Sequence, residues 1–190
     1  ASYWYQIVAL SKEAEVTLPG LFKDSYQGDS QVAGIFRSLG VETIYKDKAV
    51  ILKKNGKSVE KAGLRLYQPT RPGTNICCDL CVTKYPFPLL RPAKFENQRN
   101  RPHGCTDNGN EETGYILHET DGSVLSWEGE RCTTEEHPAI DTYEDHRMAM
   151  AFAPTCLALP EILINNPQVV SKSYPAIEDL RQAGFIIKEV

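Results

Sequence analysis

The strongest constraint on the fold is a long central stretch without a regular hydrophobic pattern. Residues 67–113 hold six of the 12 prolines and four of the six cysteines. They keep neither the two-residue period of a strand nor the period of about 3.6 residues that marks a helix. Structureless stretches of this length are uncommon inside a compact domain. We therefore predict an irregular segment here, with regular structure on either side.

The chain before this stretch has the pattern of an α/β unit. We predict a helix over residues 1–10 and a strand over residues 15–18. A second helix, capped by Asp29 and ended by Gly40, precedes two strands on either side of a turn at residues 46–48. Tyr3, Ile7 and Leu10 share one face of the first helix, and the apolar face of the second consists of Val32, Ile35, Phe36 and Leu39.

The chain after this stretch repeats the same alternation of helices and strands. Apolar residues recur in short runs that turn residues separate. The predicted elements are a hairpin over residues 115–118 and 123–127, a helix from about Tyr143, strands over residues 162–165 and 169–171, and a helix that starts at Pro175 and is closed by Gly184.

Composition narrows the class of protein. The chain has 190 residues, 41% hydrophobic and 24% charged, which fits one globular domain, whole or cut from a larger chain. It lacks the roughly 18 to 20 consecutive apolar residues of a membrane span, so we expect no membrane partner. The net charge of -4 argues against a nucleic-acid partner. Because Ala1 already lies in a helical pattern, we expect more chain upstream.

Residues 141–152 read Asp-Thr-Tyr-Glu-Asp-His-Arg-Met-Ala-Met-Ala-Phe. Thr142 and Asp145 have the spacing of a capping box, which predicts a helix start near Tyr143. His146 and Arg147 then lie in or next to the first turn, where an anion is favoured. From position alone, an N-capped helix with a solvent-exposed arginine is the simpler interpretation.

These residues closely resemble the DHRMAMAF signature of the 5-enolpyruvylshikimate-3-phosphate synthase family, the 3-phosphoshikimate 1-carboxyvinyltransferases. Residues 166–175 are similar to the family's segment with a phosphoenolpyruvate-binding lysine, and residues 1–3 and 25–29 are similar to its ASY and SMQGD elements. The resemblance implies an inside-out α/β barrel of repeated βαβαββ units, three to a domain, in a two-domain enzyme. Residues 1–66 would be a first unit without its opening strand, and residues 114–190 a third unit.

The resemblance also implies a reaction and a binding site. The carboxyvinyl group of phosphoenolpyruvate is transferred to the 5-hydroxyl of shikimate 3-phosphate, with release of phosphate. Arg147 would hold phosphoenolpyruvate through its planar guanidinium, Lys172 would add a second cation, and His146 would lie beside them. No metal or organic cofactor is implied. The expected partners are the two substrates and the amino-terminal half of the same enzyme, in the cytoplasm.

Two motifs that the family carries in its middle unit, PDLAQT and KETDR, are absent from residues 67–113. Codons exist for residues 68–81 that, read one base later, give Asn-Gln-Pro-Asp-Leu-Ala followed by Gln-Thr-Phe-Val-Val-Thr-Cys. Codons for residues 96–103 likewise give Lys-Ile-Lys-Glu-Thr-Asp-Arg. Because one shift restores both motifs in order, we hypothesise two compensating one-base changes, near residues 66–67 and 113–114.

This frameshift hypothesis has a chemical consequence. The Asp and Glu that would perform acid–base catalysis are out of frame, so we assign no catalytic residue to this chain and predict that it is inactive alone. The anion-binding residues are still in frame. We expect Arg147 and Lys172 to converge on one exposed concave edge, beside the start of the helix that carries Arg147.

Two other functions remain open at this point. The spacing of Cys78, Cys81, His103 and Cys105 suits a tetrahedral zinc site, which would make the chain a zinc-stabilised binding module. A retained domain with only a structural or interaction role is the other. The remaining cysteines, Cys132 and Cys156, are interpreted as reduced thiols. His118 and His137 are interpreted as surface residues, and Trp127 as a packing residue.

Overall fold

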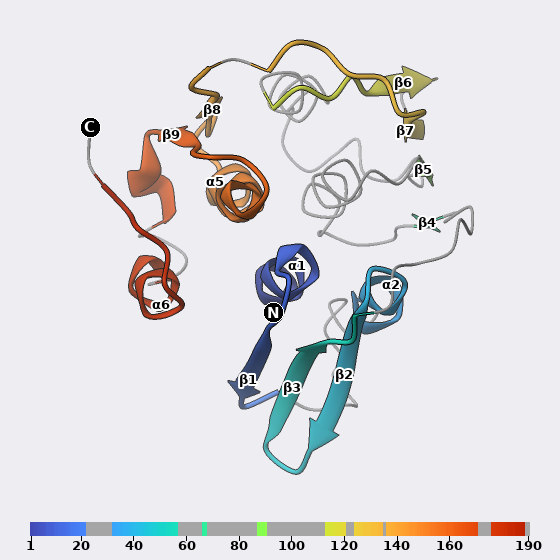
Figure 1. Cartoon of the computed structure of the whole chain (residues 1–190), viewed down its shortest axis with the longest axis vertical. Coiled ribbons are helices and arrows are strands. Elements are labelled where there is room, and N and C mark those ends of the chain that lie inside the picture. Colours follow the sequence, from blue (N-terminus) through green and yellow to red (C-terminus); the bar gives the residue numbers. More distant parts are fainter. Residues whose placement is uncertain are drawn as a thin grey trace.

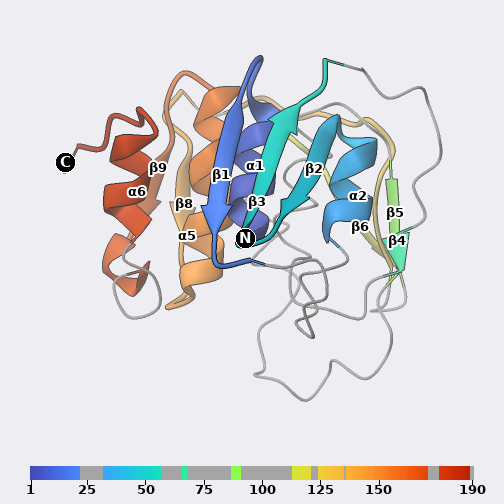
Figure 2. The same ribbon diagram turned by 90° about the horizontal axis from the view of Figure 1, so that it is seen from below.

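The structure, a computed structural model, describes residues 1–21, 32–56, 66–67, 87–90, 113–120, 124–134, 136–170 and 176–188. Helices α1 (Ser2–Leu10) and α5 (His146–Phe152) lie next to each other in the interior, and the sheets surround them (Figure 1). Turning the molecule by 90° shows sheet strands in front of α1, with α5 beside it (Figure 2). Helices α1 and α5 are therefore inside, and the sheets lie outside them (Figure 1).

The first sheet is antiparallel, with strand order β1-β3-β2. Helix α2 covers the same face of this sheet as α1 (Figure 1). Gly40 ends α2 with a φ of 79°, a left-handed conformation that glycine adopts without strain. The predicted helices and strands of this region are confirmed, apart from the cap at Asp29, which lies outside the described residues. Their bounds are β1 Glu15–Pro19, α2 Val32–Ser38, β2 Val41–Lys46 and β3 Ala49–Lys54.

The four-stranded sheet contains the antiparallel pairing of the first sheet. In the four-stranded sheet, with order β4-β5-β7-β6, β4 is parallel to β5, and β5, β7 and β6 pair as β1, β3 and β2 do. The third sheet holds the parallel pair β8 and β9, which matches β4 and β5. The four-stranded sheet thus shares its antiparallel pairing with the first sheet and its parallel pairing with the third, and the predicted division into units stays a prediction. The bounds are β4 Leu66–Tyr67, β5 Phe87–Leu90, β6 His118–Thr120, β7 Val124–Trp127, β8 Ala139–Asp141 and β9 Leu163–Asn165.

Helix α1 is buried on two sides, which the sequence did not predict. Tyr5 and Val8 pack against the first sheet and α2, and the Tyr5 and Phe36 rings lie 5.5 Å apart. Tyr3 is only partly buried and packs on the opposite side, against a cluster around Met150. Of the three residues predicted to share one face, Ile7 is buried, while Tyr3 and Leu10 are partly buried. A helix between two layers buries more than one stripe of its surface.

Three predictions need correction. Residues 169–171 were predicted as a strand, but Pro167–Val170 forms the 3₁₀ helix η4. The proline at its start has no backbone N–H to donate to a neighbouring strand. The helix predicted from Tyr143 begins at His146 instead. Within the stretch predicted to be irregular, Phe87–Leu90 forms a regular strand paired with β7, because backbone hydrogen bonding does not require a hydrophobic period. Most of residues 67–113 lie outside the described residues, so their irregularity stays a prediction.

The predicted surface and packing residues lie as expected. His118 and His137 are exposed and pair with Glu130 and Glu161, while Trp127 is 3% exposed. Cys132 and Cys156 are free thiols.

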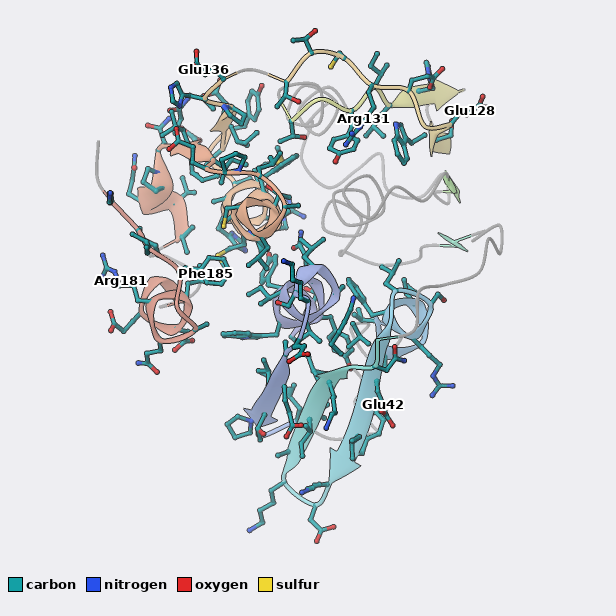
Figure 3. The ribbon with its side chains drawn as sticks, viewed as in Figure 1. Glu42, Glu128, Arg131, Glu136, Arg181 and Phe185 are labelled. Atoms are coloured by element: carbon teal, nitrogen blue, oxygen red, sulfur yellow. The ribbon has the colours of Figure 1, made fainter. Side chains whose placement is uncertain are left out.

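On α6 (Ala176–Gln182), Arg181 points away from the interior helices (Figure 3). Within the described residues, no helix is long and apolar enough to cross a membrane.

Candidate anion-binding site at the start of helix α5

The candidate site lies where the parallel strands β8 and β9 end and α5 begins. Asp141, the last residue of β8, accepts a hydrogen bond from Asn165 Nδ2, the last residue of β9, at 2.8 Å. Thr142 is fully buried, and its hydroxyl donates to the Asn166 carbonyl at 3.4 Å. Ligands of open α/β folds often bind beyond the carboxyl ends of parallel strands. These contacts fix the loop that leads to the predicted site residues.

This loop explains why α5 starts later than the sequence predicts. Tyr143 and Glu144 have φ values of 47° and 58°, the left-handed region that side chains with a Cβ rarely adopt. The Asp145 backbone N–H closes the turn on the Thr142 carbonyl at 2.7 Å. Thr142 and Asp145 therefore form a turn before the helix, and not a capping box.

Asp145 is the true cap of α5 and also the partner of Arg147. Its Oδ1 accepts the Arg147 backbone N–H at 2.9 Å and the guanidinium Nε at 3.0 Å. Its Oδ2 accepts Nη2 of the same guanidinium at 2.5 Å. The hydrogen bonds to Asp145 raise the pKa of Arg147, its burial opposes the rise, and the Asp145 charge and Tyr3 add to it. Arg147 is therefore a fixed cation with a set orientation.

The pairing limits how Arg147 binds an anion. Nε and one N–H of Nη2 donate hydrogen bonds to Asp145. The backbone N–H of Arg147, predicted to face an anion, also donates to Asp145. Within the described part of the chain, Nη1 has no assigned partner. The remaining N–H of Nη2 and the two of Nη1 form the outer edge of the planar guanidinium. That edge is able to hold a carboxylate or phosphate with two parallel hydrogen bonds.

An open hollow of about 380 Å³ adjoins this loop. Tyr143, at its rim, is 40% exposed. The lining is polar and carries two carboxylates, so the hollow itself does not favour a second anion. Its lining residues are Asp141, Tyr143, Glu144, Asn166, Gln168 and Val169.

The structure tests the predicted site residues only in part. His146 is partly exposed and lies next to Arg147, with Nδ1 3.9 Å from Asp145 Oδ1. Lys172 lies outside the described residues, so its convergence with Arg147 stays a prediction. The residue that sequence reasoning missed is Asp145, which was interpreted as the third residue of a helix. The signal was present, since an aspartate directly before an apolar helical run is a preferred cap.

The four proposed zinc ligands Cys78, Cys81, His103 and Cys105 also lie outside the described residues. In the part of the chain that the structure describes, no cluster of three or more His, Cys, Asp or Glu side chains suits a metal ion. The described site is thus built around a single paired arginine.

Two solved structures that share this fold are an EPSP synthase and an enolpyruvyl transferase. EPSP synthase from Acinetobacter baumannii matches with a TM-score of 0.62 at 15% identity, covering 96% of this chain and 44% of that one. The enolpyruvyl transferase NikO from Streptomyces tendae matches with a TM-score of 0.61 at 16% identity, covering 100% of this chain and 43% of that one. The fold is therefore that of the enolpyruvyl transferases, as the sequence predicted.

Sequence relatives identify the family within this class. A family model described as EPSP synthase (3-phosphoshikimate 1-carboxyvinyltransferase) matches residues 116–180. The 3-phosphoshikimate 1-carboxyvinyltransferase of Bacteroides fragilis is 47% identical over 191 residues, covering 99% of this chain and 46% of that protein. The same enzyme of Idiomarina loihiensis is 30% identical over 181 residues, covering 92% and 40%. The chain belongs to the EPSP synthase family and spans about half the length of the curated relatives it matches.

Proposed function

We propose that this chain is the carboxyl-terminal half of a 3-phosphoshikimate 1-carboxyvinyltransferase. Such an enzyme moves the carboxyvinyl group of phosphoenolpyruvate to the 5-hydroxyl of shikimate 3-phosphate and releases phosphate. The observation that carries the proposal is the 47% identity to the Bacteroides fragilis enzyme across 99% of this chain. The amino-terminal half is the proposed partner, and a cytoplasmic location stays a prediction.

The proposed contribution of this half is to bind phosphoenolpyruvate. The outer edge of the Arg147 guanidinium takes its carboxylate or phosphate, and Asp145 holds the guanidinium plane in place. Lys172 and His146 complete the cationic side of the site. Binding alone does not transfer the group, since the vinyl carbon must gain a proton and the hydroxyl must lose one.

We propose further that the acid–base carboxylates are lost through the frameshift over residues 67–113. The family model match begins at residue 116, just after this stretch, which supports the proposal without testing it. Resequencing the underlying DNA tests it directly. A single-base deletion near codon 66 and an insertion near codon 113 should restore the PDLA and KETDR motifs. An unambiguous DNA sequence that encodes residues 67–113 in frame with a relative's middle unit would overturn it.

Ligand binding tests the role of Arg147. Calorimetric titration with phosphoenolpyruvate should give saturable binding to the chain, and Arg147→Gln should abolish most of it. Arg181→Gln is a matched control, because Arg181 is similarly exposed and paired with one acidic residue, Glu178, on the outer helix α6. Equal binding by both variants would contradict the assignment of Arg147.

Reconstitution tests the activity. We expect the unrepaired chain, co-expressed with the amino-terminal half of the Bacteroides fragilis enzyme, to release no phosphate above background. The frame-repaired chain should release it, because acid–base groups are typically worth about 10² to 10⁴ in rate. Turnover by the unrepaired chain would refute the loss of catalytic carboxylates. Stoichiometric zinc uptake, or failure of the repaired chain to bind either substrate, would favour the zinc module or the interaction role.

A further inference from the structure

A buried glutamine connects the two interior helices. Gln6 of α1 is fully buried, and its Nε2 donates to the Ala151 carbonyl of α5 at 2.7 Å. The two residues are 145 positions apart in the chain. Since a carbonyl only accepts hydrogen bonds, the amide group has one possible orientation at this contact. The bond is therefore a specific link between α1 and α5.

The Ala151 carbonyl lies in the last turn of α5, where carbonyls lose their donors from the same helix. Pro154 stands at the start of the 3₁₀ helix η3 (Ala153–Leu157) and has no N–H. The carbonyls one turn before a proline lose a donor from their own helix. A buried carbonyl without a donor costs about 1–3 kcal/mol. Gln6 supplies a donor at this point from the neighbouring helix.

Gln6 and the candidate site lie on the same seam between α1 and α5. Ala151 is four residues after Arg147, and Gln6 is three residues after Tyr3, so each pair shares one helix face. Tyr3 also packs against the cluster that contains Ala149 and Met150 of α5. The seam therefore has two levels, with Tyr3 and Arg147 at the helix starts and Gln6 and Ala151 one turn deeper.

We propose that Gln6 is a positioning residue for Arg147, because its bond to the Ala151 carbonyl fixes how far α5 slides along α1. This role rests on the proposed function of Arg147 in binding phosphoenolpyruvate. The Oε1 atom of Gln6 is buried and has no partner among the described residues. If the side chain at this position only filled space, an apolar residue would be more stable than a buried amide. We therefore attribute the amide to the hydrogen bond that Nε2 donates.

Gln6→Met tests the role, because methionine has a similar length and no donor. Thr155→Val is the matched control. Thr155 is also buried, and its hydroxyl donates to the Phe152 carbonyl at 2.6 Å within the same segment, without crossing the seam. Both variants lose one buried hydrogen bond near the end of α5, but only Gln6→Met loses the link to α1.

The first measurement needs no ligand. The NMR signal of the Arg147 Nε–Hε group, assigned with Arg147→Lys, reports its pairing with Asp145. We expect Gln6→Met to shift this signal and to raise its hydrogen-exchange rate about tenfold, the factor that corresponds to one hydrogen bond. Thr155→Val should leave it unchanged. An unchanged Arg147 signal in Gln6→Met, or equal changes in both variants, would overturn the positioning role.

A second variant and a second measurement distinguish the possible outcomes. If Gln6→Met does not fold, Gln6→Asn keeps the amide but is one methylene shorter, so either the bond is lost or α5 moves, and an unchanged Arg147 signal overturns the role. The second measurement is the phosphoenolpyruvate affinity, expected to fall about tenfold in Gln6→Met. If the unaltered chain binds no phosphoenolpyruvate, the proposed function fails, and the NMR result still decides the role of Gln6.

Discussion

Asp145 stabilises α5 through two interactions, and different substitutions of Asp145 remove one or both of them. Its carboxylate caps the helix at the Arg147 backbone N–H, and it also pairs with the Arg147 guanidinium. Asp145→Ala removes both interactions. Asp145→Asn keeps an oxygen that is able to cap the helix but removes the negative charge, since asparagine is as good a cap as aspartate.

The structure sets the expected size of each loss. A lost cap costs about 1 kcal/mol of the free energy of unfolding. A charge-assisted hydrogen bond is worth about 1.5–3 kcal/mol when buried, but the Arg147 side chain is 45% exposed, so solvent screening leaves about 0.5–1 kcal/mol. We therefore expect a loss of about 2 kcal/mol for Asp145→Ala and of about 0.5–1 kcal/mol for Asp145→Asn.

Urea unfolding followed by circular dichroism at neutral pH measures both losses. Repeating it in about 1 M sodium chloride should shrink the loss in Asp145→Asn, because salt screens exposed ion pairs. The difference between the two variants should persist, because it reflects the cap. Equal losses in the two variants, or a loss in Asp145→Asn that salt does not change, would refute the division into cap and ion pair.

Two other predictions concern a glycine with a positive φ and a partly buried thiol. Gly114 has a φ of 90°, and a Cβ there would lie 2.5 Å from Thr134 Oγ1, so Gly114→Ala should lower the free energy of unfolding by about 2 kcal/mol. A Cβ at Gly34 in α2 would have no atom within 4 Å, so Gly34→Ala should raise the free energy of unfolding by about 0.5–1 kcal/mol. Similar shifts of the thermal unfolding temperature in both variants would contradict the role of φ. Burial raises the pKa of the Cys156 thiol, so its thiolate forms only at higher pH. Iodoacetamide should label Cys156 more slowly than exposed Cys132 at about pH 8, with the gap closing as pH rises, and equal labelling rates at about pH 8, measured by peptide mass spectrometry, would count against this shift.

The local elements could be read from the sequence where neighbouring residues determine them. The apolar spacing of Val32, Phe36 and Leu39 and the stop at Gly40 define α2 without reference to any other part of the chain. The residues around Arg147 likewise identified the family, because the order of residues in a short motif is visible in the sequence itself.

The core face of α1 and the start of α5 were decided by tertiary contacts. A period of about 3.6 residues predicts one buried stripe, but α1 lies between two layers, and Gln6 is buried by a partner 145 positions away. Tyr143 and Glu144 are held in the left-handed region next to the buried Thr142, so capping preferences alone misplaced the helix start. In both cases local preferences differ by about 1 kcal/mol or less per residue, and packing of distant segments overrides them.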